Sequence, residues 1–165
     1  INNTEVDNTE KSLDLKKVFI VHGHDDALKL EVSRFLEKLN ITPIVLHEQA
    51  NQGKTIIEKI ETYTDVGFGI VLYTSCDIGG KDKDDLKNRA RQNVVFEHGY
   101  LIGKLKRDRV VALVKGEIET PGDISGVVYI AHDGNWQFDI AKELKSVGYD
   151  IDLNKLLGWL SKYDV

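Results

Sequence analysis

The sequence predicts an α/β domain in which helices cover both faces of a parallel β-sheet. Short apolar runs alternate along the chain with segments whose apolar residues repeat at helical spacing. The apolar runs are nearly continuous, which is typical of strands buried on both faces. Consecutive parallel strands need right-handed helical crossovers, so the helices divide between the two faces of the sheet.

Strands are assigned to the apolar runs that are too short to be helices. In chain order, the five predicted strands are 17–21, 42–46, 68–73, 110–114 and 127–130. Five strands with helical crossovers in this length favour a flavodoxin-like sheet in the order 2-1-3-4-5. In such sheets a ligand binds at the carboxyl ends of the strands, near the point where the strand order reverses.

Helices are assigned where apolar residues repeat at helical spacing and a capping residue marks one end. The first helix begins at Asp25 or Asp26 and ends at Asn40. The other predicted helices are 54–63, a helix that begins at Asn93, 136–147 and 153–161. The segment 76–92 is rich in glycine and charged residues, and is therefore predicted to be a polar surface loop.

Composition limits the classes of function. The 165 residues suit one domain, with 1–16 as a polar linker or tail and 17–165 as the folded unit. The net charge of −5 argues against a duplex nucleic acid partner, because phosphate binding needs a basic face. The single cysteine excludes an internal disulfide and fits the cytoplasm. No apolar stretch reaches the roughly 18 residues of a membrane span.

One carboxylate, Glu97, lies within the nearly apolar helix that begins at Asn93. In helical projection the apolar residues cover well over half the circumference, so this helix is expected to be buried on most sides. Glu97 shares the remaining polar strip with Asn93, Tyr100 and Lys104. The strip is expected to border either solvent or a pocket. If Asn93 is the N-cap, Glu97 lies near the first turn, where the helix dipole favours an ionised carboxylate.

The segment 22–26, which follows the first strand, is a second candidate. Gly23 permits a tight turn with close backbone approach to a ligand, and the amides that open the next helix can hold a phosphate. A purely structural interpretation, in which Gly23 turns the chain and Asp25 caps the helix, stays open. His22 and His24 lack the further ligands of a tetrahedral site, so no metal is predicted.

Residues 52–55, Gln-Gly-Lys-Thr, are similar to the end of a phosphate-binding P-loop. Glu48 stands where that pattern needs glycine, and the segment follows the second strand rather than the first. A true P-loop is therefore not predicted, but Lys54 remains a candidate ligand contact.

Three segments carry a resemblance to a known family. In chain order they are KVFIVHGHDD, RARQNVVFEHGYLIGKL and PGDISGVVYI. Together they resemble the bacterial TIR-like domain of predicted nucleotide-binding proteins, a family that includes effector domains of STING-type and cyclic-nucleotide-triggered antiphage systems. The resemblance covers about residues 17–149. It departs from the family pattern at Gly122, where a serine is expected.

The resemblance implies a TIR fold that cleaves NAD+ between ribose and nicotinamide. It implies that Glu97 is catalytic, that the first loop binds the nucleotide, and that NAD+ is the substrate, so no cofactor is expected. It also implies activity on self-association, driven by a fused or upstream sensor domain to which the 1–16 segment could connect. The implied substrate contacts of the first loop are Gly23, His24 and Asp25. The further candidate contacts are Lys54, Arg89, Arg91 and Asn93, with either arginine suited to the pyrophosphate.

A lone carboxylate suits this chemistry. The cationic nicotinamide ring of NAD+ departs as a neutral molecule, so no general acid is needed to protonate it. The carboxylate can stabilise the oxocarbenium charge, hold the ribose hydroxyls or act as a nucleophile, and the sequence leaves these three roles open. It also leaves open whether the product is linear or cyclic ADP-ribose. Two other functions fit: a nucleoside deoxyribosyltransferase-like enzyme with a helix glutamate as nucleophile, and a non-catalytic module that binds nucleotide or assembles through TIR contacts.

Overall fold

The computed structural model of the protein describes residues 12–46, 55–63, 65–122 and 126–162. Its centre is a five-stranded parallel sheet in the order β2-β1-β3-β6-β7. The strands are β1 (Lys17–Val21), β2 (Thr42–Val45), β3 (Gly69–Tyr73), β6 (Val110–Val114) and β7 (Val128–Ala131). This confirms the predicted flavodoxin-like order, in which β6 and β7 are the fourth and fifth parallel strands.

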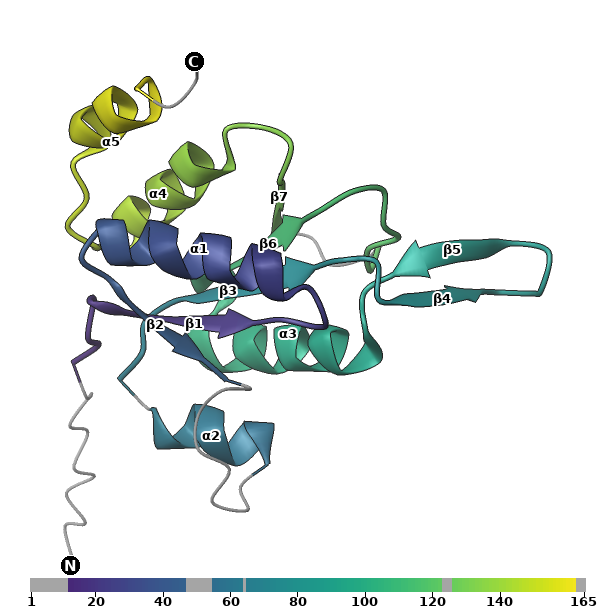
Figure 1. The fold of residues 1–165 in the computed structure, drawn as a ribbon. Coiled ribbons are helices and arrows are strands. Elements are labelled where there is room, and N and C mark those ends of the chain that lie inside the picture. The colour runs from purple at the N-terminus through teal and green to yellow at the C-terminus, as the bar shows by residue number, and fades with distance from the viewer. Residues whose placement is uncertain (1–11, 47–54, 64, 123–125, 163–165) are drawn as a thin grey trace, which may run out of the picture.

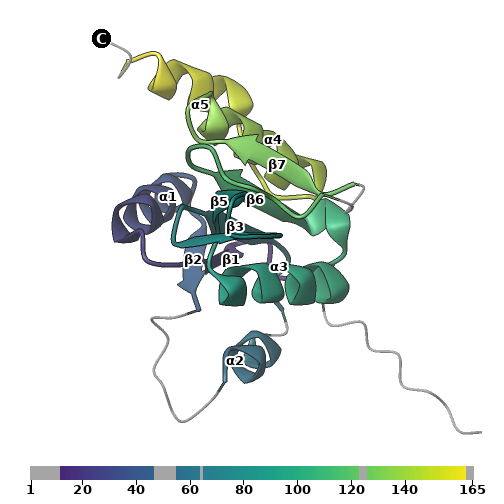
Figure 2. The same cartoon turned by 90° about the vertical axis from the view of Figure 1, so that its right-hand side faces the viewer.

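Helices cover both faces of the sheet, as predicted (Figures 1 and 2). One face carries α1 (Asp26–Lys38), α4 (Trp136–Ser146) and α5 (Leu153–Leu160). The opposite face carries α2 (Ile56–Thr62) and α3 (Gln92–Leu105), and the short 3-10 helix η1 (Arg107–Arg109) leads from α3 into β6. None of the described helices is long and apolar enough to cross a membrane.

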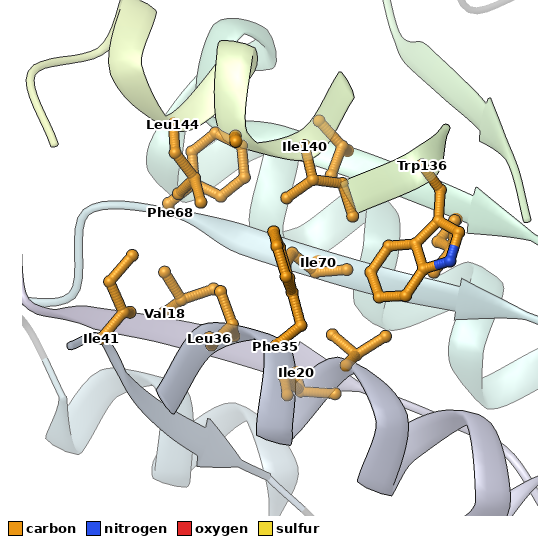
Figure 3. Close-up of a cluster of buried hydrophobic side chains, with 14 of the residues drawn as sticks. Val18, Ile20, Phe35, Leu36, Ile41, Phe68, Ile70, Trp136, Ile140 and Leu144 are labelled. Atoms are coloured by element: carbon orange, nitrogen blue, oxygen red, sulfur yellow. The ribbon is translucent and has the colours of Figure 1, made fainter. Parts of the chain in front are cut away.

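Alternate residues of each central strand supply two separate cores. Val18 and Ile20 of β1 face α1 and α4, whereas Phe19 and Val21 belong to the cluster beneath α2 and α3. Figure 3 shows the first cluster, where side chains of α1 and α4 meet over the sheet. Phe35 and Trp136 pack edge to face there, with ring centroids 5.2 Å apart. Complete burial of each large apolar side chain stabilises the fold by roughly 1.5–3 kcal/mol.

The segment 76–92 is not the polar loop that its composition predicted. It contains an antiparallel hairpin of β4 (Asp77–Gly80) and β5 (Leu86–Arg89), which projects from one end of the domain (Figure 1). The turn depends on Gly80, because a Cβ atom there would lie 1.8 Å from the Asp85 carbonyl oxygen. Strands this short, rich in glycine and charge, lack the apolar alternation that identifies strands in a sequence.

Capping interactions fix the ends of several helices. Asn40 follows the C-cap residue Leu39 and adopts φ 58, in agreement with its predicted role as the residue that ends α1. Thr55 and Glu58 form a reciprocal capping box at the start of α2. Before β1, Asp14 forms a parallel bridge with Val66, so the residues just before the first strand are attached to the domain.

Candidate active site

Glu97 lies in a crevice between α2 and α3 and is only 3% exposed. The crevice has a volume of about 210 Å³ and is lined by Thr55, Ile56, Ile57, Ile60, Asn93, Phe96, Glu97 and Tyr100. Two members of the predicted polar strip, Asn93 and Tyr100, line it beside Glu97. At Asn93, Glu97 and Tyr100 the strip therefore borders a pocket.

The same strip of α3 holds α2 in place. The Tyr100 hydroxyl donates to Glu61 Oε1 at 3.1 Å, and Lys104 Nζ donates to the Ile60 carbonyl at 2.8 Å. Burial lowers the pKa of Lys104, which shows that this ammonium is partly removed from water. Side chains that flank Glu97 on its own helix thus fix the opposite wall of the crevice.

Two expectations about α3 are wrong. The helix begins at Gln92 with Arg91 as its N-cap residue, so Asn93 is not the cap, and no side chain caps this end. Glu97 therefore lies in the second turn, beyond the stretch where the helix dipole acts most strongly on a carboxylate. In addition, Phe96 is 62% exposed, so the wide apolar arc is not buried on most sides.

Behind Glu97, the next residue of α3 is held by the central strand. His98 is 1% exposed, and its Nδ1 lies 2.9 Å from the Tyr73 hydroxyl at the end of β3. Burial lowers the pKa of His98 to about 4, so the ring is neutral at physiological pH. Sequence reasoning gave His98 no role. The available signal was a tyrosine at the carboxyl end of the central strand and a histidine on the sheet-facing side of α3.

The first loop meets the start of α3. His24 Nε2 lies 2.7 Å from Arg91 Nη1, which brings two of the candidate nucleotide contacts together. Gly23 is packed so closely that an added Cβ would lie 2.7 Å from Cys76 Sγ. Arg91 and Glu97 are six residues apart on one helix, so this junction lies about 9 Å from Glu97 along the helix axis.

Asp25 caps α1, as the purely structural interpretation of the first loop requires. Its Oδ1 accepts from the Leu28 amide at 2.9 Å, which caps α1, and its Oδ2 accepts from Lys115 Nζ at 2.7 Å. The hydrogen bond from Lys115 lowers the pKa of Asp25, so the carboxylate is charged at neutral pH. Lys115 directly follows β6, so this ion pair spans the carboxyl ends of the sheet.

Arg89 lies on a different surface. Its guanidinium forms an ion pair with Glu119 beside an open cavity of about 1010 Å³ between the hairpin, the start of α3 and the segment before β7. Glu97 is not among the residues that line this larger cavity. Lys54 lies outside the described residues. Within the described ranges, no three His, Cys, Asp or Glu side chains are grouped as metal ligands.

Comparisons with known proteins place this arrangement in a family. The sequence model described as CAP12/Pycsar effector protein, TIR domain, matches residues 17–134. The chain is 42% identical to "Uncharacterized protein YuaY" of Escherichia coli (strain K12) over 146 residues, which are 86% of this chain and 49% of that protein. It is 39% identical to "Protein tirC" of Dictyostelium discoideum over 142 residues, 79% of this chain and 68% of that protein.

The residues that the family model matches include the strands of the sheet, the first loop and α3. The chain spans about half the length of the E. coli relative that it matches. The five parallel strands and the flanking helices agree with the fold that the resemblance implied. The chain therefore belongs to the TIR-domain family of CAP12/Pycsar effector proteins.

Proposed function

We propose that the domain cleaves NAD+ at the bond between nicotinamide and ribose, with Glu97 as the catalytic carboxylate. The observation that carries the proposal is the burial of this side chain at the wall of a small crevice, where it is 3% exposed. Burial removes this carboxylate from the screening of bulk water. Such a group interacts strongly with a positive charge that develops beside it.

The surroundings of Glu97 suit this step. Nicotinamide departs as a neutral molecule, so the ribose is left with oxocarbenium character that an anion stabilises. The crevice is lined mainly by apolar side chains of α2 together with Asn93 and Tyr100, which limits competing water. His98, the neighbouring titratable group, is neutral because burial lowers its pKa to about 4, so it does not offset the negative charge.

The crevice is too small for the whole dinucleotide. Its volume of about 210 Å³ lies below the roughly 300–1,000 Å³ of pockets that enclose drug-sized ligands. The nicotinamide riboside end is therefore the part that lies beside Glu97. The pyrophosphate then extends along α3 toward Arg91 and His24, which are hydrogen-bonded to each other 2.7 Å apart. Arg89 already forms an ion pair with Glu119, so it is less suited than Arg91 to bind the pyrophosphate.

The test is to incubate concentrated protein with NAD+ and to resolve nicotinamide, linear ADP-ribose and cyclic ADP-ribose by chromatography. We expect release of nicotinamide by the wild type and a loss of at least about 100-fold in Glu97→Gln, as for removal of a charge-stabilising group. Glu37→Gln, which changes an exposed glutamate of α1, should retain full activity. Equal activity of Glu97→Gln and the wild type would exclude the catalytic role.

A parallel incubation with deoxynucleosides and a free base distinguishes the main alternative from cleavage of NAD+. Base exchange without cleavage of NAD+ would identify a nucleoside deoxyribosyltransferase-like enzyme. Nucleotide binding without turnover, unchanged in Glu97→Gln, would identify a non-catalytic module. Both assays use the same protein samples, so the three functions give different results.

We further propose that the domain acts in the cytoplasm as an antiphage effector, switched on when a sensor domain gathers several copies. The family description supports the effector role. The chain matches only half of its E. coli relative, which leaves room for such a domain in that protein. Specific activity should then rise with protein concentration. A high specific activity that does not change on dilution would contradict activation by assembly.

A further inference from the structure

The β4–β5 hairpin has one free edge. Among the described residues, β4 pairs with β5 and with no other strand. The outer side of β5 is occupied, because the Glu119 amide donates to the Asn88 carbonyl at 2.9 Å and Glu119 also binds Arg89. An unpaired edge presents a row of backbone donors and acceptors to another strand. Figure 1 shows that this edge lies well away from the central sheet.

One face of the hairpin exposes two large apolar side chains to solvent. Ile78 is 70% exposed and Leu86 is 56% exposed, the most exposed large apolar side chains of the hairpin. The register pairs Ile78 with Asn88 and Gly80 with Leu86, so Ile78 and Leu86 project from the same face. Natural edge strands usually carry devices that prevent pairing, such as charges or proline, but Ile78, Gly79 and Gly80 provide none.

Charged residues of opposite sign flank the segment 78–80. They would face each other if a two-fold axis related two copies of β4. Asp77 opens β4 and Lys81 directly follows it, and neither forms an ion pair with a described residue. If two copies of β4 align antiparallel with Gly79 on the axis, Asp77 of each copy lies opposite Lys81 of the other. Opposite charges at directly facing positions stabilise a strand pair, and here they occur twice.

We propose that β4 pairs with β4 of a second copy of this chain, antiparallel about a two-fold axis at Gly79, to give a four-stranded sheet in the order β5-β4-β4-β5. Ile78 then faces Gly80 of the second copy, and both copies contribute Ile78 and Leu86 to one apolar face. In such a two-fold contact each copy uses the same strand, so the contact gives a closed dimer and not a chain of copies. The proposal concerns association alone and does not depend on cleavage of NAD+.

The charge arrangement gives the first test, with sedimentation velocity over a range of protein concentrations as the readout. Lys81→Glu places two carboxylates opposite each other at both ends of the paired strands. We expect it to raise the dimer dissociation constant by about tenfold or more. Lys83→Glu makes the same change of charge in the turn, outside the paired segment, and should leave the dissociation constant unchanged.

Mixing experiments make this test specific to the two-fold register. Asp77→Lys alone should also weaken association, because it places two ammonium groups opposite each other. An equimolar mixture of Asp77→Lys and Lys81→Glu restores two attractive pairs, so the mixture should associate more tightly than either variant alone. Circular dichroism of each variant confirms that it is folded. A mixture that associates no better than the separate variants would overturn the register.

A cysteine cross-link gives the second test. Facing residues of antiparallel strands have Cα atoms about 4.5–5.5 Å apart, within the roughly 4.4–6.8 Å that a disulfide spans. In a Cys76→Ser background, Gly79→Cys should form a covalent dimer under mild oxidation. The Cβ atom of the introduced cysteine would lie 2.8 Å from Arg89 Nη1 and 3.2 Å from Arg89 Cδ, so the Arg89 side chain must shift to accommodate it. Lys83→Cys in the same background should stay monomeric. Failure of Gly79→Cys to cross-link, or equal cross-linking of both variants, would overturn the proposal.

Discussion

The Tyr73 hydroxyl lies 2.9 Å from Nδ1 of His98, which ties the end of the central strand β3 to the turn of α3 that carries Glu97. The two rings pack edge to face with centroids 5.5 Å apart, and Tyr129 of β7 packs edge to face against both. Burial lowers the pKa of His98 and raises the pKa of Tyr73. Both groups are therefore neutral over the whole physiological range of pH.

The buried His98 makes the free energy of unfolding depend on pH. Its pKa is about 4 in the folded protein and near 6.5 in the unfolded chain. Between these values the unfolded chain binds more protons, so stability is complete above about pH 6.5 and falls as the pH is lowered toward 4. The full effect is about 3 kcal/mol. We expect wild-type urea midpoints to fall more steeply over this window than those of His98→Phe. Parallel curves would show that His98 does not titrate as described.

Removal of the Tyr73 hydroxyl should destabilise the fold. Tyr73→Phe leaves Nδ1 of the buried His98 without its hydrogen-bond partner, which costs about 1–3 kcal/mol. Tyr129→Phe is the matched control, because among the described residues the Tyr129 hydroxyl makes only a long hydrogen bond of 3.5 Å, to the Pro121 carbonyl. Chemical denaturation of both variants measures the difference. A loss in Tyr73→Phe no larger than in the control would contradict an important role for this hydrogen bond.

The close contact between Gly23 and Cys76 predicts a coupled pair of mutations. In Gly23→Ala the new Cβ would lie 2.7 Å from Cys76 Sγ, and such overpacking costs about 1–3 kcal/mol. Cys76→Ala removes the sulfur, so the same Gly23→Ala change should cost much less in that background. A double-mutant cycle from urea unfolding measures this coupling. Additive effects would show that Gly23 is required for a reason other than space.

Asp25 should act on stability chiefly through its cap. Asp25→Ala removes the acceptor for the Leu28 amide and should cost about 1 kcal/mol. Asp25→Asn keeps a capping oxygen and loses the ion pair to the partly exposed Lys115, so its cost should be smaller. Thermal unfolding compares the two variants. If Asp25→Asn retains stability but cleavage of NAD+ is lost, Asp25 contacts the substrate as well.

Most of the fold could be predicted from the sequence because the central strands and the main helices have strong, regular apolar patterns. β1 and β3 are nearly continuous apolar runs, and α1 repeats its apolar residues at helical spacing between a good cap and Asn40. The strand order was favoured by five strands joined by helical crossovers in a chain of this length, and the resemblance implied the same order. The β4–β5 hairpin was missed because its two four-residue strands are rich in glycine and charge and lack apolar alternation.

The candidate site was predictable only in part. The polar strip of α3 was visible from spacing, and the structure places Asn93, Glu97 and Tyr100 together on one crevice. The opposite wall, formed by α2, could not be assigned, because helical periodicity does not say which surface a helix meets. The N-cap was misplaced by two residues, since α3 begins at Gln92 without any side-chain cap that a sequence pattern could reveal.

The two hydrogen bonds from α3 to α2 have a consequence for engineering. An isolated helix of seven residues, such as α2, is too short to persist in water. Tyr100 and Lys104 dock it through Glu61 and the Ile60 carbonyl. A chimaera that imports the Glu97 segment into a related scaffold must therefore import α2 as well, because the transplanted carboxylate would otherwise lack the surface that shelters it.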